Sequence, residues 1–214
     1  FPVTERASAG EVVARMGKTA FQARNVAQAV RIWRRMLEDD VTIMFGLAGA
    51  MIPAGMREVV VYLIQRRLVD CIVSTGANLF HDVYETLGKP HWQSSPHEDD
   101  VETDFTQAEE FCVAFASSLD PSRPYTTREY FELMGKALIP QAREEGILTA
   151  AAKAGVPVFT AALGDSVHGL SIASSRMRTG HQLLFDIIGD VLETGYVSLT
   201  AKGTGVIYVG GGTP

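Results

Sequence analysis

The residues best suited to chemistry in this sequence are small residues and one aspartate that follow apolar segments. Four such runs occur, at Gly46–Ala50, Ser74–Ala77, Leu163–Ser166 and Gly210–Gly212. A glycine at a strand end lets a ligand approach the backbone, and the N–H groups of a following helix offer donors and partial positive charge to a pyrophosphate. Asp165 could accept hydrogen bonds from ribose hydroxyls. The pattern predicts a dinucleotide site, with ordinary tight turns as the alternative because no G-x-G-x-x-G motif occurs.

Two of the five histidines are expected beside this site. His81 opens the helix after the second strand, and His168 follows Asp165 closely, so both could face the same edge of the sheet. An exposed or supporting position is the alternative for each. His97 and the acidic residues after it match no known pattern of metal ligands, so we predict no metal. The acidic stretch 98–104 would favour a polycationic substrate, although such loops are usually just solvated.

Lys202 and the two cysteines are the remaining candidate nucleophiles. Lys202 lies between apolar segments and could form an imine with a carbonyl substrate, but a structural role is commoner for such a lysine. Cys71 and Cys112 lie inside apolar runs, which predicts small buried hydrophobic residues.

Alternating strand and helix patterns would position these residues. Apolar runs of the kind found in buried parallel strands occur at Val41–Leu47, Val69–Val73, Val156–Leu163 and Gly205–Val209. The expected helices cover residues 25–37, 53–64, 79–87, 108–118, 126–145, a short segment ending at 155, and 183–195. Strands separated by helices pair in parallel, which brings their carboxyl ends to one ligand-binding edge. We therefore predict a Rossmann-like, doubly wound α/β fold, with a mainly parallel sheet and helices on both faces, as one domain over 1–214.

Composition narrows the class of protein. The 214 residues are 46% apolar, which is enough for a substantial core without disulfides, and the formal charge of −6 argues against nucleic-acid binding. No apolar stretch has the length of a membrane span and no signal peptide is visible, so a cytoplasmic protein is expected. The chain starts at Phe1 and stops just after a strand, from which we expect it to be part of a longer protein.

Several segments together resemble the deoxyhypusine synthase family. They are, in order, Phe21–Asn25, Gly55–Glu58, Leu68–Asp70, Val156–Phe159 and Gly210–Gly212, and the similarity covers about Lys18 to Pro214. The segments Ser74–Leu79 and Gly210–Pro214 are more similar in sequence to the bacterial deoxyhypusine synthase-like branch.

The resemblance implies an NAD-dependent transfer of an aminobutyl group from spermidine to an acceptor amine. The acceptor would be a lysine of a translation factor, or a free diamine such as putrescine in a homospermidine-type reaction. It also implies a homotetramer with NAD at the subunit interfaces. Carried over by position, the NAD-contacting residues are Gly49, Ala50, Met51, Ile52, Pro53, Thr75, Gly76, Ala77, Asp165 and Gly211. His81 and His168 are the candidates for contacting the substrate.

The chain also departs from the family pattern. A serine-asparagine pair of the family is Gly49–Ala50 here, two adjacent glutamates are Phe80 and His81, and an aspartate that holds an amine is Leu170. The catalytic lysine of the family lies in a Trp-Gly-Lys segment, which does not occur in these residues, so we expect it beyond Pro214. The alternative to an aminobutyltransferase is a catalytically silent NAD-binding subunit of an oligomer.

Overall fold

The computed structural model of the protein describes residues 6–91 and 105–211. The helices are α1 (Ala9–Met16), α2 (Phe21–Glu38), α3 (Arg57–Gln65), α4 (Gly76–Thr86), α5 (Thr106–Ser118), α6 (Thr127–Leu138), α7 (Ile147–Ala154), α8 (Val167–Thr179) and α9 (Ile187–Thr200). The strands are β1 (Thr42–Leu47), β2 (Cys71–Ser74), β3 (Pro124–Tyr125), β4 (Val158–Phe159), β5 (Leu184–Phe185) and β6 (Thr204–Val209). Among these helices none is long and apolar enough to cross a membrane.

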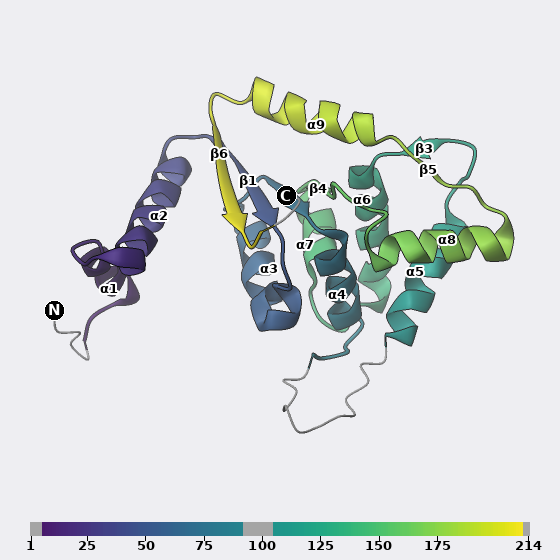
Figure 1. Cartoon of the computed structure of the whole chain (residues 1–214), viewed down its shortest axis with the longest axis horizontal. Coiled ribbons are helices and arrows are strands. Elements are labelled where there is room, and N and C mark those ends of the chain that lie inside the picture. The colour runs from purple at the N-terminus through teal and green to yellow at the C-terminus, as the bar shows by residue number, and fades with distance from the viewer. Residues whose placement is uncertain (1–5, 92–104, 212–214) are drawn as a thin grey trace.

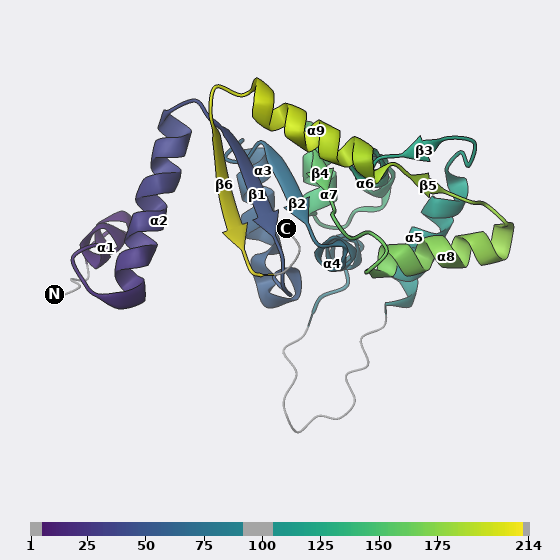
Figure 2. The ribbon, with the colours of Figure 1, turned by 45° about the horizontal axis from the view of Figure 1, so that its top comes forward.

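The main sheet has four parallel strands in the order β4-β2-β1-β6. In register, Leu47 at the end of β1 pairs with Ser74 of β2 and Val209 of β6, so three strand ends lie side by side. The α1 and α2 pair lies beside the β6 edge, whereas α5, α6 and α8 lie on the β4 side (Figures 1 and 2). The predicted α/β fold with a mainly parallel sheet is confirmed, and β3 and β5 form a small additional parallel pair.

The core lies between this sheet and the helices that connect its strands. Alternate residues of β1, namely Ile43, Phe45 and Leu47, are buried, as period-2 side-chain alternation requires. Helices α6 and α7 pack closely at Gly135. A Cβ at this position would lie 2.3 Å from the Leu148 carbonyl oxygen. Glycine at this position therefore sets the distance between the two helices.

Several helix boundaries differ from the prediction. Helices α2 and α4 begin a few residues earlier than expected. The segment Ile52–Met56 forms a wide turn in which Gly55 has φ +87°, and α3 begins only at Arg57. Within α3, Val59 is 48% exposed. Helix α6 ends at Leu138, since Pro140 in the following turn has no N–H to continue the helix.

Helix α9 was also predicted incompletely. It begins at Ile187 and continues through Gly195 to Thr200, and most of its apolar side chains lie in solvent. The exposed apolar residues of α9 are Ile187, Ile188, Val191, Leu192, Tyr196 and Leu199. Helix α2 likewise exposes Val26, Val30 and Leu37. Figure 1 shows α9 running along one side of the molecule and α2 projecting beside β6.

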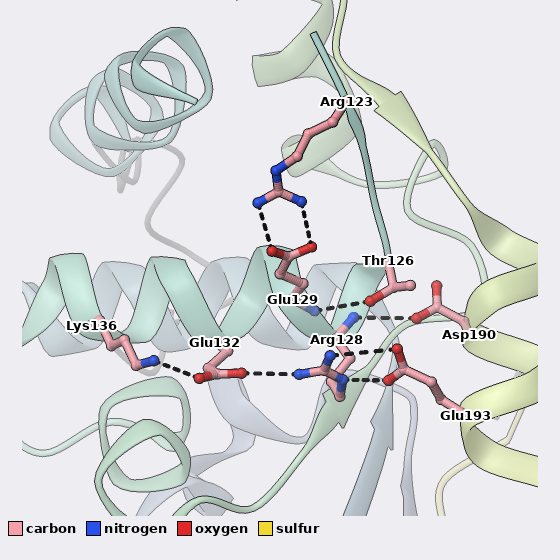
Figure 3. A network of polar contacts seen from close by, with 8 residues as sticks. All are labelled: Arg123, Thr126, Arg128, Glu129, Glu132, Lys136, Asp190 and Glu193. Carbon is pink, nitrogen blue, oxygen red and sulfur yellow. Dashed lines mark hydrogen bonds and ion pairs between the residues drawn. The ribbon is translucent and has the colours of Figure 1, made fainter. Parts of the chain in front are cut away.

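A polar network joins α9 to the start of α6 (Figure 3). Asp190 accepts hydrogen bonds from the backbone N–H groups of Thr127 and Arg128, at 2.9 and 3.2 Å. The Arg128 guanidinium bonds Glu193 of α9 and, at 2.9 Å, Glu132 of its own helix. This network fixes α9 by its polar side and leaves its apolar side uncovered.

Candidate functional site

A cavity of about 290 Å³ lies at the carboxyl ends of β1, β2 and β4. It is lined by Gly49, Ala50, Ser74, Thr75, Gly76, Ala77, Asn78, His81, Ala161, Ala162 and Asp165. The edge predicted from the sequence is therefore hollow, and seven of the predicted site residues line it. Met51, Ile52, Pro53, Gly211 and His168 are not part of the lining.

The N-terminus of α4 forms one wall of the cavity. Thr75 is the N-cap residue and its side chain makes no capping hydrogen bond, so the N–H groups of the first turn have no partner within the helix. Oriented N–H groups and the helix dipole make such a terminus a binding site for a phosphate group. A Cβ on Gly76 would lie 2.5 Å from Ser166 Oγ, so only glycine allows the loop before α8 to approach this closely.

Asn78 holds two strand-end segments together at the cavity. Its Oδ1 accepts a hydrogen bond from the Ile52 N–H at 3.2 Å, and its Nδ2 donates to the Leu47 carbonyl at 3.5 Å. The side chain also bonds Thr75 Oγ1 at 3.2 Å and is almost fully buried. Asn78 was not among the predicted site residues, although an amide in the first turn of a helix after a strand is a usable signal.

The end of β6 closes on the end of β1. Gly210 has φ +86°, and a Cβ there would lie 2.0 Å from the Ala48 carbonyl oxygen. This backbone contact orders the turn at Gly49, which itself has φ +73°. Gly211, predicted to contact the cofactor, follows this contact but does not line the cavity.

The α4 terminus and Asp165 indicate which kind of ligand suits the cavity. The N–H groups of the first turn of α4 would donate to phosphate oxygens, and the Asp165 carboxylate would accept hydrogen bonds from hydroxyl groups. These groups fit a ligand that carries phosphate and hydroxyl groups, such as NAD. Thr160 Oγ1 is buried and has no hydrogen-bond partner in the described part of the chain, but Thr160 is not among the lining residues.

His81 is the histidine that reaches the cavity. Its Nδ1 lies 2.9 Å from Nε2 of His91, and His91 Nδ1 lies 2.7 Å from Glu85 Oε1. Burial, and secondarily the nearby His91, lower the pKa of His81 to about 4. The imidazole is therefore neutral near pH 7 and available as a hydrogen-bond acceptor.

His168 lies in the core instead of at the cavity. It is 0% exposed and contacts the rings of Phe80, Tyr130 and Phe131. Burial lowers its pKa to about 3, against a smaller opposing effect of a hydrogen bond to the Leu79 backbone. The expectation that it faces the same edge as Asp165 was wrong, because α8 turns this position towards the aromatic side chains of α4 and α6.

Comparison with known proteins identifies the family. The profile of the deoxyhypusine synthase family matches residues 11–104 and 101–214, which together span nearly all of the sequence. This chain belongs to the deoxyhypusine synthase family.

Curated deoxyhypusine synthase relatives are similar over almost the whole chain. A protein of Methanosarcina mazei named "Probable deoxyhypusine synthase 2" is 40% identical over 97% of this chain and 65% of its own length. A protein of the same name from Archaeoglobus fulgidus is 37% identical over 93% of this chain and 70% of its own length. A "Deoxyhypusine synthase-like protein" of Chlorobaculum parvum is 30% identical over 95% of this chain and 63% of its own. The chain thus spans about 65% of the length of the first of these relatives.

The fold matches as well. The crystal structure of a deoxyhypusine synthase homologue from Entamoeba histolytica superposes with a TM-score of 0.79 at 23% identity, covering 97% of this chain and 77% of that one.

The departures from the deoxyhypusine synthase pattern lie in different environments. Phe80 is buried in the core, Leu170 is exposed on α8, and His81 lines the cavity. At these three positions, where the family has carboxylates, His81 is thus the one residue that presents a polar side chain to a ligand in the cavity.

The other candidate nucleophiles have structural positions. Lys202 lies on the surface before β6, at the opposite end of the strands, and its Nζ is 2.7 Å from Asp40 Oδ2. Cys71 and Cys112 are buried, as predicted, and burial raises the pKa of each thiol to about 12. Within residues 6–91 and 105–211 no group of three metal-binding side chains occurs, whereas His97 and the acidic stretch 98–104 lie outside the described residues.

Proposed function

We propose that this chain is the NAD-binding part of an NAD-dependent transferase that moves an aminobutyl group from spermidine to an acceptor amine. The observation that carries the proposal is the cavity at the sheet edge, with the bare N-terminus of α4 on one wall and Asp165 among its lining, in a member of the deoxyhypusine synthase family. Because the chain spans only part of its relatives, the activity is proposed for the full-length protein.

Named residues of the cavity would hold the cofactor. The N–H groups of Gly76 and Ala77 would donate to the pyrophosphate, and Asp165 would accept hydrogen bonds from ribose hydroxyls. Gly49 and Ala50 would bring backbone groups close to the nucleotide, while Met51, Ile52, Pro53 and Gly211 would lie behind the lining. Bound NAD supplies the acceptor for the electrons released when the amine carbon is oxidised.

The substrate would be held differently from the family pattern. Phe80 and Leu170 offer no charge to pair with an ammonium group, so among the three positions that depart from the family pattern only His81 would offer a polar contact to an amine nitrogen. We propose no contact for His168, since its ring is enclosed in the core. The lysine that would carry the aminobutyl group is expected beyond these 214 residues, as no Trp-Gly-Lys occurs among them.

The same departures favour two alternatives. A homospermidine-type enzyme would use putrescine as the acceptor in place of a protein lysine. A catalytically silent subunit would bind NAD through the same cavity and would scaffold an oligomer, because the lost carboxylates at Phe80 and Leu170 remove substrate contacts without altering the cofactor wall.

A homotetramer is part of the proposal. The uncovered apolar residues of α9, from Ile187 to Leu199, would pack against a second copy of this chain, as the resemblance implies for the family. Helices that expose continuous apolar stripes are unusual on monomers, and pairing two copies would remove them from water.

The test uses the full-length protein in three assays. Calorimetric titration with NAD is expected to show binding that weakens about tenfold or more in Asp165→Ala, since each lost hydrogen bond to a charged group contributes about 1.5–3 kcal/mol. Asp120→Ala, which changes an exposed aspartate in the turn after α5, is the control and should bind as the wild type does. NADH formation on adding spermidine alone supports the transferase, and formation of homospermidine when putrescine is added as the acceptor supports the homospermidine-type enzyme. NAD binding without turnover indicates the silent subunit, and failure to bind NAD refutes the proposal.

A further inference from the structure

A chain of hydrogen-bonding side chains leads away from the cavity through the protein. It starts at His81, continues through His91, and ends at Glu85, whose second oxygen Oε2 lies 2.7 Å from Arg57 Nε. Arg57 is buried and also pairs with Glu144. Three titratable side chains are thus linked in series, and the last of them contacts a buried arginine. The helical structure of α4 does not need such a series.

The series connects two cavities. His81 lines the cavity at the sheet edge, whereas His91, Glu85, Arg57 and Glu144 line a second cavity of about 350 Å³. The first cavity faces the ends of the strands, and the second one opens beside the segment that follows α4. The two imidazoles are therefore the link between them.

For a pair of neutral rings, the hydrogen bonds determine which nitrogen of each ring carries the proton. The Glu85 carboxylate can only accept, so His91 donates from Nδ1, and the neutral ring then presents a lone pair at Nε2. His81 must then donate to that lone pair from its own Nδ1, which leaves its Nε2 as an acceptor. Nε2 of His81 makes no hydrogen bond within the described residues, so a cavity ligand can occupy it.

Aromatic rings hold both imidazoles in place. The ring of Phe105 packs edge-on against His81 at 5.6 Å between centroids and lies 6.5 Å from His91. Tyr84 contacts His91 at 5.0 Å. Rings fixed in this way do not have to reorganise when a proton moves along the series.

We propose that His81, His91 and Glu85 form a proton relay, in which His81 Nε2 accepts the proton of a substrate ammonium group and Glu85 receives a proton at the other end. This inference rests on the proposed function, because it assumes an amine substrate in the cavity. The ammonium N–H bond breaks as the His81 Nε2–H bond forms. His81 Nδ1–H passes to His91 Nε2, and His91 Nδ1–H passes to Glu85 Oε1. Both imidazoles are neutral before and after, and the carboxylate becomes a carboxylic acid that exchanges its proton with water in the second cavity.

The groups around His81 favour proton transfer through its ring over a stable protonated state of the ring. Burial and His91 disfavour a charged His81, whose pKa is about 4. The concerted route, which keeps the ring neutral, therefore has the lower free-energy barrier. The charged or titratable groups around the relay are Asp165 across the first cavity, Asp82 and Glu85 on α4, Arg57 on α3, Glu144 after α6, and Lys89 beside His91. The neutral amine that results from the transfer has the free lone pair that oxidation to an imine requires.

Two measurements on the full-length protein test the relay. The first is ¹⁵N NMR of histidine-labelled protein without substrate, in which protonated and unprotonated ring nitrogens have well-separated shifts. We expect His81 to be protonated at Nδ1 and bare at Nε2, and His91→Phe, which keeps a ring against Tyr84 and Phe105, to remove that preference. A neutral His81 with its proton on Nε2, or unchanged His81 shifts in His91→Phe, would overturn the relay.

The second measurement is the pH profile of spermidine-dependent NADH formation. His91→Phe is expected to lower kcat about tenfold or more, within the range usual for proton-transfer groups, and to move the acidic limb of the profile, while the affinity for NAD stays unchanged. Lys202→Gln, which removes a surface charge at the opposite end of the strands, should keep both kcat and the profile. A His91→Phe enzyme with wild-type kcat and profile would refute the relay even if the transferase is real. Absence of any turnover in the wild type would refute the proposed function, and the NMR result would still decide whether the relay exists.

Discussion

Asp190 of α9 accepts a hydrogen bond from the backbone N–H of Thr127, 2.9 Å away at the start of α6. The carboxylate thus caps a helix 63 residues earlier in the chain, while the neighbouring Arg128 pairs with Glu193 one turn further along α9 (Figure 3). The described contacts of α9 are otherwise few, so this cap is the main attachment of a helix whose apolar side lies in solvent.

Replacement of Asp190 should release α9. Asp190→Ala leaves the buried Thr127 N–H without an acceptor, which is expected to lower the free energy of unfolding by about 2 kcal/mol. Urea denaturation measures this loss, and hydrogen exchange should show faster exchange over residues 187–200. Asp190→Asn keeps one carbonyl oxygen, so its free energy of unfolding should lie between those of the wild type and Asp190→Ala. Equal stability of all three proteins would contradict the capping role.

The buried carboxylate of Asp82 should matter for a different helix. Its two oxygens accept the N–H groups of Ile147 and Leu148, at 2.6 and 2.9 Å, and so cap the first turn of α7. Asp82→Ala leaves both buried donors without partners and is expected to cost about 3 kcal/mol of unfolding free energy. Thermal unfolding followed by circular dichroism provides the measurement. The matched control Asp120→Ala, at an exposed turn, should change the midpoint little, and a similar drop in both variants would argue against the cap.

The sequence predicted the edge of the sheet at which the cavity lies, because local signals specify it. Each strand from Val41 to Val73 is a short apolar run, and each ends in small residues that open a helix or turn, so the βα pattern follows from neighbouring residues alone. Parallel pairing then places Gly49, Thr75 and Asp165 together, although they are far apart in the chain.

The remaining features depend on contacts between distant segments. The stripe of α9 shows that the helix is amphipathic but not whether its apolar face is covered, and the same pattern occurs in an interface. The role of His91 arises only when the irregular segment after α4 folds back onto His81. His168 was misplaced because α8 was not predicted. Its serines, glycine and arginines give weak periodicity, and without the helix the direction of the side chain was unknown.

Burial of His168 should make its contribution to stability depend on pH. The folded-state pKa of about 3 lies below the ordinary value of 6.5, so the unfolded chain takes up the proton first as the pH falls. The stabilisation is present above pH 6.5 and is lost at about 1.4 kcal/mol per pH unit as the pH falls from there towards 3. Asp82 has the opposite dependence, because burial raises its pKa to about 6, so total stability need not follow His168 alone.

A difference between two proteins isolates this effect. His168→Phe keeps an aromatic ring among Phe80, Tyr130 and Phe131 but cannot take up a proton. The difference in unfolding free energy, wild type minus variant, should decrease by about 2.3 kcal/mol between pH 6.5 and about 4.5, as measured by urea denaturation at each pH. The contribution of Asp82 is common to both proteins and cancels. A difference that does not change with pH would show that His168 titrates normally.

A substitution at Gly76 tests whether the cavity wall formed by the N-terminus of α4 binds NAD. A Cβ at this position would lie 2.5 Å from Ser166 Oγ and 2.6 Å from Ser166 Cβ, so Gly76→Ala must push the loop that carries Asp165 away from the α4 N-terminus. We expect the affinity for NAD to fall about tenfold or more, since about 1.4 kcal/mol of lost contact is enough for a factor of ten. Gly164→Ala lies in the same loop and has no atom within 4 Å of its added Cβ, so it should bind NAD as the wild type does. Calorimetric titration of both variants separates the alternatives. Wild-type affinity in both variants would place the nucleotide elsewhere. An equal loss of affinity in both would mean that the loop tolerates no change at all. Only a loss specific to Gly76→Ala therefore supports a phosphate held between the loop and the first turn of α4.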